Sequence, residues 1–152
     1  MLDHVQPLPP IDVGLLDARG CILAEDVAAP WPLPPFDNSA MDGYAVQAGS
    51  VAGASPHQPV HLNVLEDIPA GARPTSTVGP GTAARIMTGA PMPYGADAVV
   101  PVEDTDAGMP EVAVNGPTAV GRYIRHAGDD VPAGAIVLKA GTMIDARQTA
   151  LL

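Results

Sequence analysis

Proline and glycine interrupt this chain so often that the sequence itself argues against long helices. The 152 residues include 18 prolines and 16 glycines. Proline removes a backbone donor and glycine weakens a helix, so closely spaced copies of both divide the chain into short elements. The chain is nevertheless 47% hydrophobic and only 16% charged, unlike a disordered tail. This combination predicts a mainly β, turn-rich globular chain with one domain or two small ones.

The charge balance excludes several classes of partner. Seven basic residues stand against 17 acidic ones, for a net charge of −10. Such a surface repels nucleic-acid phosphates and anionic membranes, so we expect no nucleic-acid and no membrane partner. The apolar runs all fall well short of the ~20 residues of a transmembrane helix. The lone Cys21 sits in an apolar run and is expected to be a small buried residue, so we predict a reducing, cytoplasmic location.

Short apolar runs between turn signals predict the strands. In residues 59–65 the apolar Val60, Leu62 and Val64 alternate with polar residues, as in a half-buried strand. Regular spacing of such runs suggests a small antiparallel sandwich or barrel. The expected strands are residues 20–28, 44–46, 59–65, 84–87, 98–102, 112–114 and 135–139.

Two short helices are also expected. The first covers residues 11–19 and ends at Gly20. The second covers residues 146–152, with Asp145 as its N-cap. This second helix reaches Leu152 without a Gly, Asn or Pro stop signal, so we expect the natural polypeptide to continue and the chain to be an N-terminal fragment.

The most unusual stretch of polar residues lies in 35–45. It places two carboxylates, an amide and a hydroxyl within six residues, beside a stiff proline run. Polar groups on a loop with rigid neighbours are typical of binding sites. The alternative is that Asn-Ser and Asp42-Gly43 are ordinary turns, the second of them a hairpin turn. The local pattern leaves both interpretations open.

A second stretch, residues 85–93, ends a predicted strand at Thr88 and continues into a Gly- and Pro-rich loop. The Thr88 hydroxyl either faces a ligand or satisfies a local backbone group. The sequence also leaves two interpretations of Glu103 and Asp104: they bind a cation, or they are solvated surface residues.

Three further patterns carry weaker signals. His57 and His61 have the spacing of a helical metal pair, but the local pattern is a strand. Residues 78–82 are Gly-rich but lead into a strand, whereas a phosphate loop leads into a helix. Residues 122–126 contain two arginines and a histidine, which either attract an anion or pair with the carboxylates of residues 129–130. We favour the pairing.

Three motifs together resemble one known family. Residues 35–46 (PFDNSAMDGYAV), 85–91 (RIMTGAP) and 95–100 (GADAVV) are similar to those of the molybdopterin molybdenumtransferases, which include the bacterial MoeA proteins and the C-terminal domain of gephyrin. The similarity continues through residues 121–142 and covers about residues 4–152.

The resemblance implies an activity and an architecture. Members of the family insert molybdate into adenylated molybdopterin, release AMP and use magnesium. They are homodimers with a β-rich domain inserted into a linker domain, and a larger α/β domain follows that binds the pterin nucleotide. The resemblance therefore implies a barrel-like β insert on a small mixed linker domain, without the catalytic α/β domain. The expected bounds are 1–36 and 125–152 for the linker and 37–124 for the insert.

The resemblance also assigns site residues. Asp42 and Thr88 occupy the positions of the family's cleft residues and are the expected catalytic pair. Asp42 is also a candidate magnesium ligand, although most ligands should come from the absent domain. Asn38, Ser39, Arg85 and Gly89 are candidate substrate-binding residues. The fragment alone is expected to be inactive. Two alternatives stay open: a scaffold-binding module, or a dimerisation piece without its own chemistry.

Overall fold

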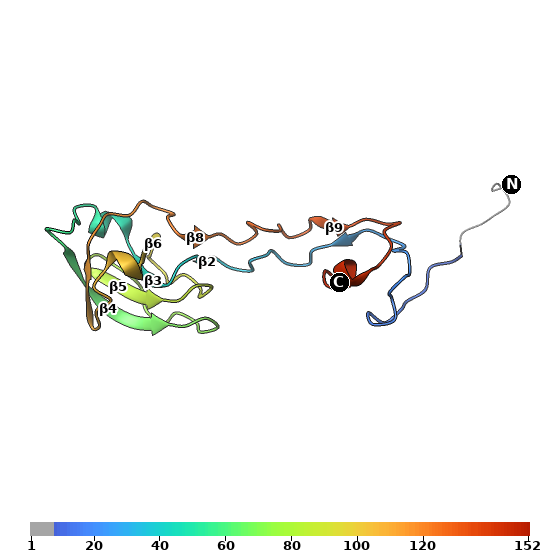
Figure 1. Cartoon of the computed structure of the whole chain (residues 1–152), viewed down its shortest axis with the longest axis horizontal. Coiled ribbons are helices and arrows are strands. Elements are labelled where there is room, and N and C mark those ends of the chain that lie inside the picture. Colours follow the sequence, from blue (N-terminus) through green and yellow to red (C-terminus); the bar gives the residue numbers. More distant parts are fainter. Residues whose placement is uncertain (1–7) are drawn as a thin grey trace. The chain divides into compact units, whose positions relative to one another are not determined.

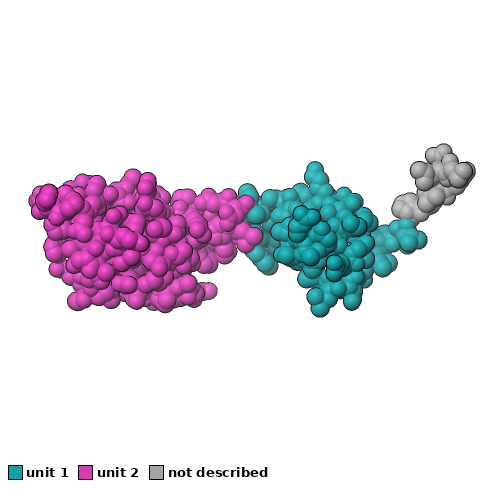
Figure 2. All heavy atoms as spheres, in the orientation of Figure 1, with its two compact units in different colours: residues 1–31, 131–152 teal, residues 32–130 magenta. Residues whose placement is uncertain are grey.

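The computed structural model describes residues 8–152, which form two compact units (Figure 2). The larger unit comprises residues 32–130, and the smaller unit comprises the described residues up to 31 together with residues 131–152. The larger unit is thus one continuous segment, and the smaller unit consists of the segments before and after it in the sequence. The expected bounds of the insert, 37 and 124, lie inside the larger unit.

A five-stranded sheet forms the larger unit (Figure 1). Its strand order is β6-β3-β5-β4-β7. The strands are β3 (Gly43–Val46), β4 (Val60–Ile68), β5 (Thr82–Ile86), β6 (Ala98–Pro101) and β7 (Glu111–Val114). Past β6, the chain passes through the 3-10 turn η3 (Val102–Asp104), and Thr105 then bridges to Val114 at the opposite edge of the sheet. The sheet therefore curls into a half-barrel.

One pair of strands departs from the expected antiparallel sheet. β4 and β5 are parallel, whereas the other three pairs are antiparallel. The chain between them, residues 69–81, therefore crosses back instead of forming a tight hairpin. The sheet is mixed, and local periodicity carries no information about strand direction.

Apolar side chains cover both faces of the sheet. One cluster contains Tyr44, Leu62 and Val100, and the other contains Ile68 and Ile86. Strands buried on both faces become continuously apolar, as β3 and β6 are throughout their length. β4, which lies between β5 and β7, keeps the predicted alternation, because Leu62 is buried while His61 and Asn63 are exposed.

A second, two-stranded sheet of the larger unit contains β2 (Asn38–Ser39) and β8 (Ile124–Arg125). The pairing continues beyond it, because the Gly128 and Asp130 N–H groups donate to Pro34 O (3.0 Å) and Leu33 O (2.9 Å). A short 3-10 turn, η2 (Ala48–Val51), follows β3.

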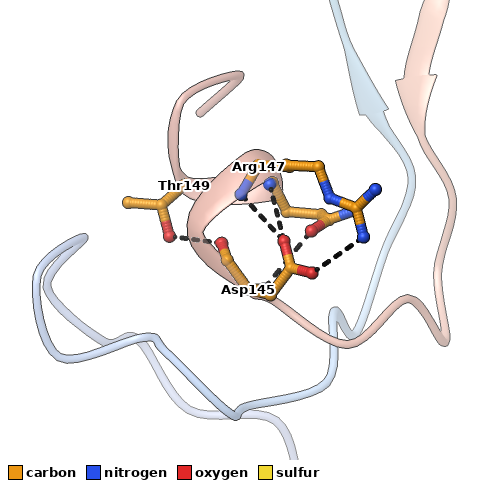
Figure 3. A network of polar contacts seen from close by, with 4 residues as sticks. Asp145, Arg147 and Thr149 are labelled. Atoms are coloured by element: carbon orange, nitrogen blue, oxygen red, sulfur yellow. Dashed lines mark hydrogen bonds and ion pairs between the residues drawn. The ribbon is translucent and has the colours of Figure 1, made fainter.

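The smaller unit contains one strand pair and one helical turn. β1 (Val27–Ala28) pairs with β9 (Ile136–Leu138). The helix α1 (Ala146–Thr149) begins at Asp145, whose carboxylate accepts from the Arg147 and Gln148 N–H groups (Figure 3). Gln148 completes a capping box, so the predicted N-cap is confirmed.

The expected helix over residues 11–19 is wrong. The segment forms turns, including an Asp17 N–H bond to Gly14 O of 2.9 Å. Short helices depend on packing of an apolar face, but Ile11 and Leu16 are 79% and 90% exposed.

The strand expected over residues 20–28 is also mostly wrong, since β1 occupies only its end and Ile22 forms an isolated bridge to Met143. Cys21 is exposed, not buried. None of the helices in residues 8–152 has the length and apolarity needed to cross a membrane.

Candidate functional site

Backbone hydrogen bonds join the two motif segments, residues 37–42 and 87–92, into an irregular ladder. Gly89 N–H donates to Ser39 O (2.8 Å), and Ser39 N–H donates to Ala90 O (3.0 Å). Further along, Met92 N–H donates to Asp37 O (3.0 Å). The ladder therefore brings together two polar stretches that are about 50 residues apart in sequence.

Asp42 and Thr88 meet at one end of this ladder. Asp42 Oδ1 accepts from both Thr88 N–H and Thr88 Oγ1, each at 2.7 Å. These two bonds, first from the hydroxyl and then from the N–H, hold the pKa of the Asp42 carboxyl below its usual value, and Arg85 adds a smaller attraction. Both residues are exposed. The result is an ionised, oriented carboxylate at the surface.

This geometry decides two alternatives that the sequence left open. The Thr88 hydroxyl does not bond to a local backbone group; it donates to a carboxylate 46 residues away. Asp42-Gly43 is not a hairpin turn, because Gly43 lies in β3 between Ile86 of β5 and Pro101 of β6. A Cβ at Gly43 would collide with Val100 O. Glycine is therefore required beside Asp42 for the strands to approach closely.

The amide and the hydroxyl of the first motif point inward. Asn38 and Ser39 are 4% and 0% exposed. Asn38 Nδ2 donates to Phe36 O (3.1 Å), and Ser39 Oγ bonds to both Met41 O and Met41 N–H. In the free chain, these side chains shape the loop that presents Asp42.

The two remaining substrate-binding candidates also lie near this end of the ladder. The Arg85 guanidinium is 5.9 Å from the centre of the Tyr44 ring, and its Nη1 donates to Tyr44 Oη (3.3 Å). Tyr44 Oη in turn donates to Gly108 O (3.0 Å). Gly89 is exposed with φ +81°, a conformation that glycine adopts without strain. Its Cβ position meets open space.

The third motif, residues 95–100, supports the strand ends instead of the exposed pair. Asp97 Oδ1 accepts from Ala48 N–H (2.6 Å), and Gln47 Nε2 donates to Gly95 O (3.1 Å). Gly95 has φ +83°, and its Cβ position would collide with Val78 O. These contacts give this motif a structural role.

An ion pair that no sequence pattern predicted lies at the other end of the ladder. Asp37 Oδ2 lies 3.0 Å from His126 Nδ1, and Asp37 Oδ1 accepts from Ala127 N–H (2.9 Å). The expected pairing of residues 122–126 with the carboxylates of 129–130 is therefore wrong for the His126 ring. Only the His126 backbone N–H reaches Asp129 (2.7 Å). Asp37 and His126 are 89 residues apart, and no local signal connects them.

The residues here match a partial magnesium site at most. Among residues 8–152 there is no cluster of three or more His, Cys, Asp or Glu side chains able to hold a metal. His61 pairs with Glu111 at 3.1 Å. Mg²⁺ often binds through one or two carboxylates, with waters and substrate phosphates as the other ligands. Asp42 suits the role of one such carboxylate.

Comparison with known proteins identifies the family of this chain. All of residues 1–152 match the family model "MoeA N-terminal region (domain I and II)". The chain is 54% identical to molybdopterin molybdenumtransferase 2 of Mycobacterium tuberculosis H37Rv over 135 residues, covering 89% of this chain and 33% of that protein. It is 41% identical over 144 residues to the Bacillus subtilis molybdopterin molybdenumtransferase, covering 92% and 34%.

The fold agrees with solved structures. The crystal structure of the molybdopterin biosynthesis MoeA protein from Pyrococcus horikoshii superposes with a TM-score of 0.85 at 37% identity, covering 91% of this chain and 37% of that one. The chain spans about a third of the length of the curated relatives it matches. This chain belongs to the MoeA family, as its N-terminal region, and is homologous over most of its length to molybdopterin molybdenumtransferases.

Proposed function

We propose that this chain is the N-terminal part of a cytoplasmic molybdenumtransferase that inserts molybdate into adenylated molybdopterin and releases AMP. The single observation that supports this most is the double hydrogen bond from Thr88 to Asp42. It joins two motifs of the family at an exposed position. The chain contributes this pair, and the rest of the protein contributes the pterin-binding domain.

In this proposal the two residues have different tasks. Asp42 holds a negative charge at a defined place, because both Thr88 bonds go to its Oδ1 atom. The residue is exposed, so Oδ2 serves to bind a cation or orient a water. Thr88 positions the carboxylate. Magnesium, when bound, would neutralise phosphate charge as AMP departs. The half-barrel supplies the rigid support that such a site needs.

A chimaera tests the proposal. Residues 1–152 replace the matching region of the M. tuberculosis molybdenumtransferase 2, and molybdate-dependent AMP release is measured. We expect an active chimaera, an Asp42→Asn variant slower by about 10²-fold, the scale of one lost electrostatic contact, and little change in unfolding midpoint. Asp130→Asn, an exposed carboxylate outside the ladder, is the matched control.

Two results would count against the proposal. An inactive but folded chimaera would contradict the function. Full activity of Asp42→Asn at saturating magnesium would leave Asp42 as a structural residue. The chain without the remaining two thirds should release no AMP, and turnover by the purified chain would contradict that expectation.

We further propose that the active protein is a homodimer in which Asp42 and Thr88 face the pterin-binding domain of the partner subunit. A carboxylate and a hydroxyl cannot enclose a pterin nucleotide, so a second surface must contribute. Mixing Asp42→Asn with a variant disabled in the pterin-binding domain should restore about a quarter of the activity, because half of the random dimers contain one intact site of two. If activity does not recover although the subunits are shown to exchange, Asp42 acts with the pterin-binding domain of its own chain. The shared-site model would then be wrong.

A further inference from the structure

The larger unit contains a hollow that the proposed site does not use. Its volume is about 570 Å³. Three segments form it: residues 36–37, residues 71–74, and residues 91–94. All three belong to the larger unit.

Backbone and carboxylate bonds hold the three walls in place. Glu66 accepts from the Thr75 and Ser76 N–H groups at 2.9–3.1 Å and from the Thr75 hydroxyl at 2.8 Å, which anchors the end of the 71–74 wall. Val78 N–H donates to Tyr94 O (2.8 Å) and Met92 N–H donates to Asp37 O (3.0 Å). The hollow is thus built before any ligand arrives, which lowers the entropic cost of binding.

The lining combines aromatic faces with one cation. Tyr94 is 83% exposed and Phe36 is 45% exposed, and both line the hollow together with Met92. Arg73 is an exposed guanidinium on a chain with a net charge of −10. Asp37 also lines the hollow, but its two oxygens are occupied by Ala127 N–H and the His126 ring. Flat apolar faces beside an exposed guanidinium suit a planar ring that carries a negative group.

The hollow and the Asp42–Thr88 pair lie along the same ladder. The ladder runs from Phe36 and Asp37 beside Met92 to Asp42 beside Thr88. Asp42 lies six positions after Phe36, and an extended segment of that length spans at most ~20 Å. A single elongated ligand can therefore contact both places.

We propose that this hollow binds a planar nitrogen heterocycle that carries a phosphate, with the ring against Tyr94 and Phe36 and the phosphate toward Arg73. The inference rests on the proposed function, whose substrate contains two groups of this chemistry: the pterin and the adenylate. The shared chemistry defines the site, and the experiment distinguishes the two sources.

The test is a titration of the ¹⁵N-labelled chain followed by NMR. The probes are AMP, neopterin monophosphate and, as a ligand without a ring, ribose 5-phosphate. We expect at least one ring-containing probe to shift the amide signals of Phe36, Arg73 and Tyr94. Ribose 5-phosphate should bind at least about fivefold more weakly, the lower end of what stacking on an aromatic side chain contributes.

Variants assign the effect to named groups. Tyr94→Leu should weaken binding at least about fivefold, while Tyr94→Phe should retain it, because only the ring face is used. Arg73→Gln should weaken both ring-containing probes. Arg122→Gln is the matched control, since that guanidinium stacks on Tyr123, 4.6 Å from the ring centre, and does not line this hollow.

Several outcomes would overturn the inference. These are absence of binding by both ring-containing probes, equal binding of ribose 5-phosphate, or unchanged binding after Tyr94→Leu. Shifts of the same amides with protein concentration alone would show instead that a second copy covers the hollow. An active chimaera whose KM is unaffected by Tyr94→Leu would reject this site and leave the proposed function standing. An inactive chimaera whose hollow still binds the probes would reject the proposed function and leave this site standing.

Discussion

The two units use the same short elements but are stabilised differently. Of the 23 buried apolar residues among residues 8–152, 19 lie in residues 32–130 and four, Ala18, Ala29, Leu138 and Ile144, lie in the smaller unit. Both apolar clusters belong to the larger unit. Since burial of apolar surface is the main favourable contribution to folding, the larger unit is the rigid part, and it carries the Asp42–Thr88 pair.

Backbone hydrogen bonds hold the smaller unit together. The Gly20, Leu23 and Ile144 N–H groups donate to carbonyls of distant segments at 2.8–2.9 Å. Meanwhile Leu16 and Met143 are 90% and 61% exposed. Both units contain many prolines and glycines, yet one is a packed half-barrel and the other a hydrogen-bonded framework. Four predictions test this difference.

The largest expected effect is on the half-barrel. Gly43→Ala should lower the free energy of unfolding of the larger unit by about 3 kcal/mol or more, because the new Cβ collides with Val100 O between two strands. Urea unfolding measures the change. Gly49→Ala, whose Cβ position meets open space, is the control and should cost far less. Equal midpoints for the two variants would contradict the close approach.

Removing core volume compares the units directly. Leu62→Ala should lower the free energy of unfolding by about 2–5 kcal/mol, the range for a fully buried leucine. Leu138→Ala should cost less, because Leu138 is 8% exposed and lies outside both clusters. Hydrogen exchange before mutation should be slower for β3 and β5 amides than for β1 and β9 amides. A larger loss for Leu138→Ala would reverse the comparison.

The end of the smaller unit should depend on its cap. Asp145→Ala removes both carboxylate bonds at the start of α1, so the Thr149 and Ala150 amides should exchange faster with solvent. Asp145→Asn should largely preserve their protection, because asparagine is an equally good N-cap. If the amides exchange equally fast in both variants, the carboxylate charge and not the capping hydrogen bonds would be responsible for the protection.

The smallest effect should be a change of stability with pH that comes from the Asp37–His126 pair. The hydrogen bond to Asp37 raises the pKa of His126 above the ordinary 6.5, while bonds from the Ala127 N–H and from His126 lower the pKa of Asp37 below 3.8. The His126 contribution to stability is therefore complete below pH 6.5 and is lost as the pH rises through its folded pKa. The Asp37 contribution is complete above its ordinary pKa and is lost as the pH falls through the folded value.

NMR titration of the His126 ring checks this window. Asp37→Asn should return the His126 pKa toward 6.5. Asp130→Asn removes one charge from the same segment but leaves both Asp37 bonds in place. A similar shift in the two variants would mean that general surface charge raises the pKa.

Much of the local structure followed from the sequence. The alternation around Leu62 located β4, and short apolar runs located β3, β5, β6, β7 and β9. The cap at Asp145 was predicted from the residue types alone. These features depend on neighbours a few residues apart, so a local pattern carries the necessary information. The same motifs also indicated the family and drew attention to Asp42 and Thr88.

Tertiary structure decided the rest, because the partners are far apart in sequence. The bonds between Asp42 and Thr88 span 46 residues, and the Asp37–His126 pair spans 89. The parallel direction of β4 and β5 and the exposure of Ile11 and Leu16 likewise depend on what the rest of the chain supplies. A local pattern predicts which face of a strand is apolar, but only the folded chain determines which distant group lies opposite it.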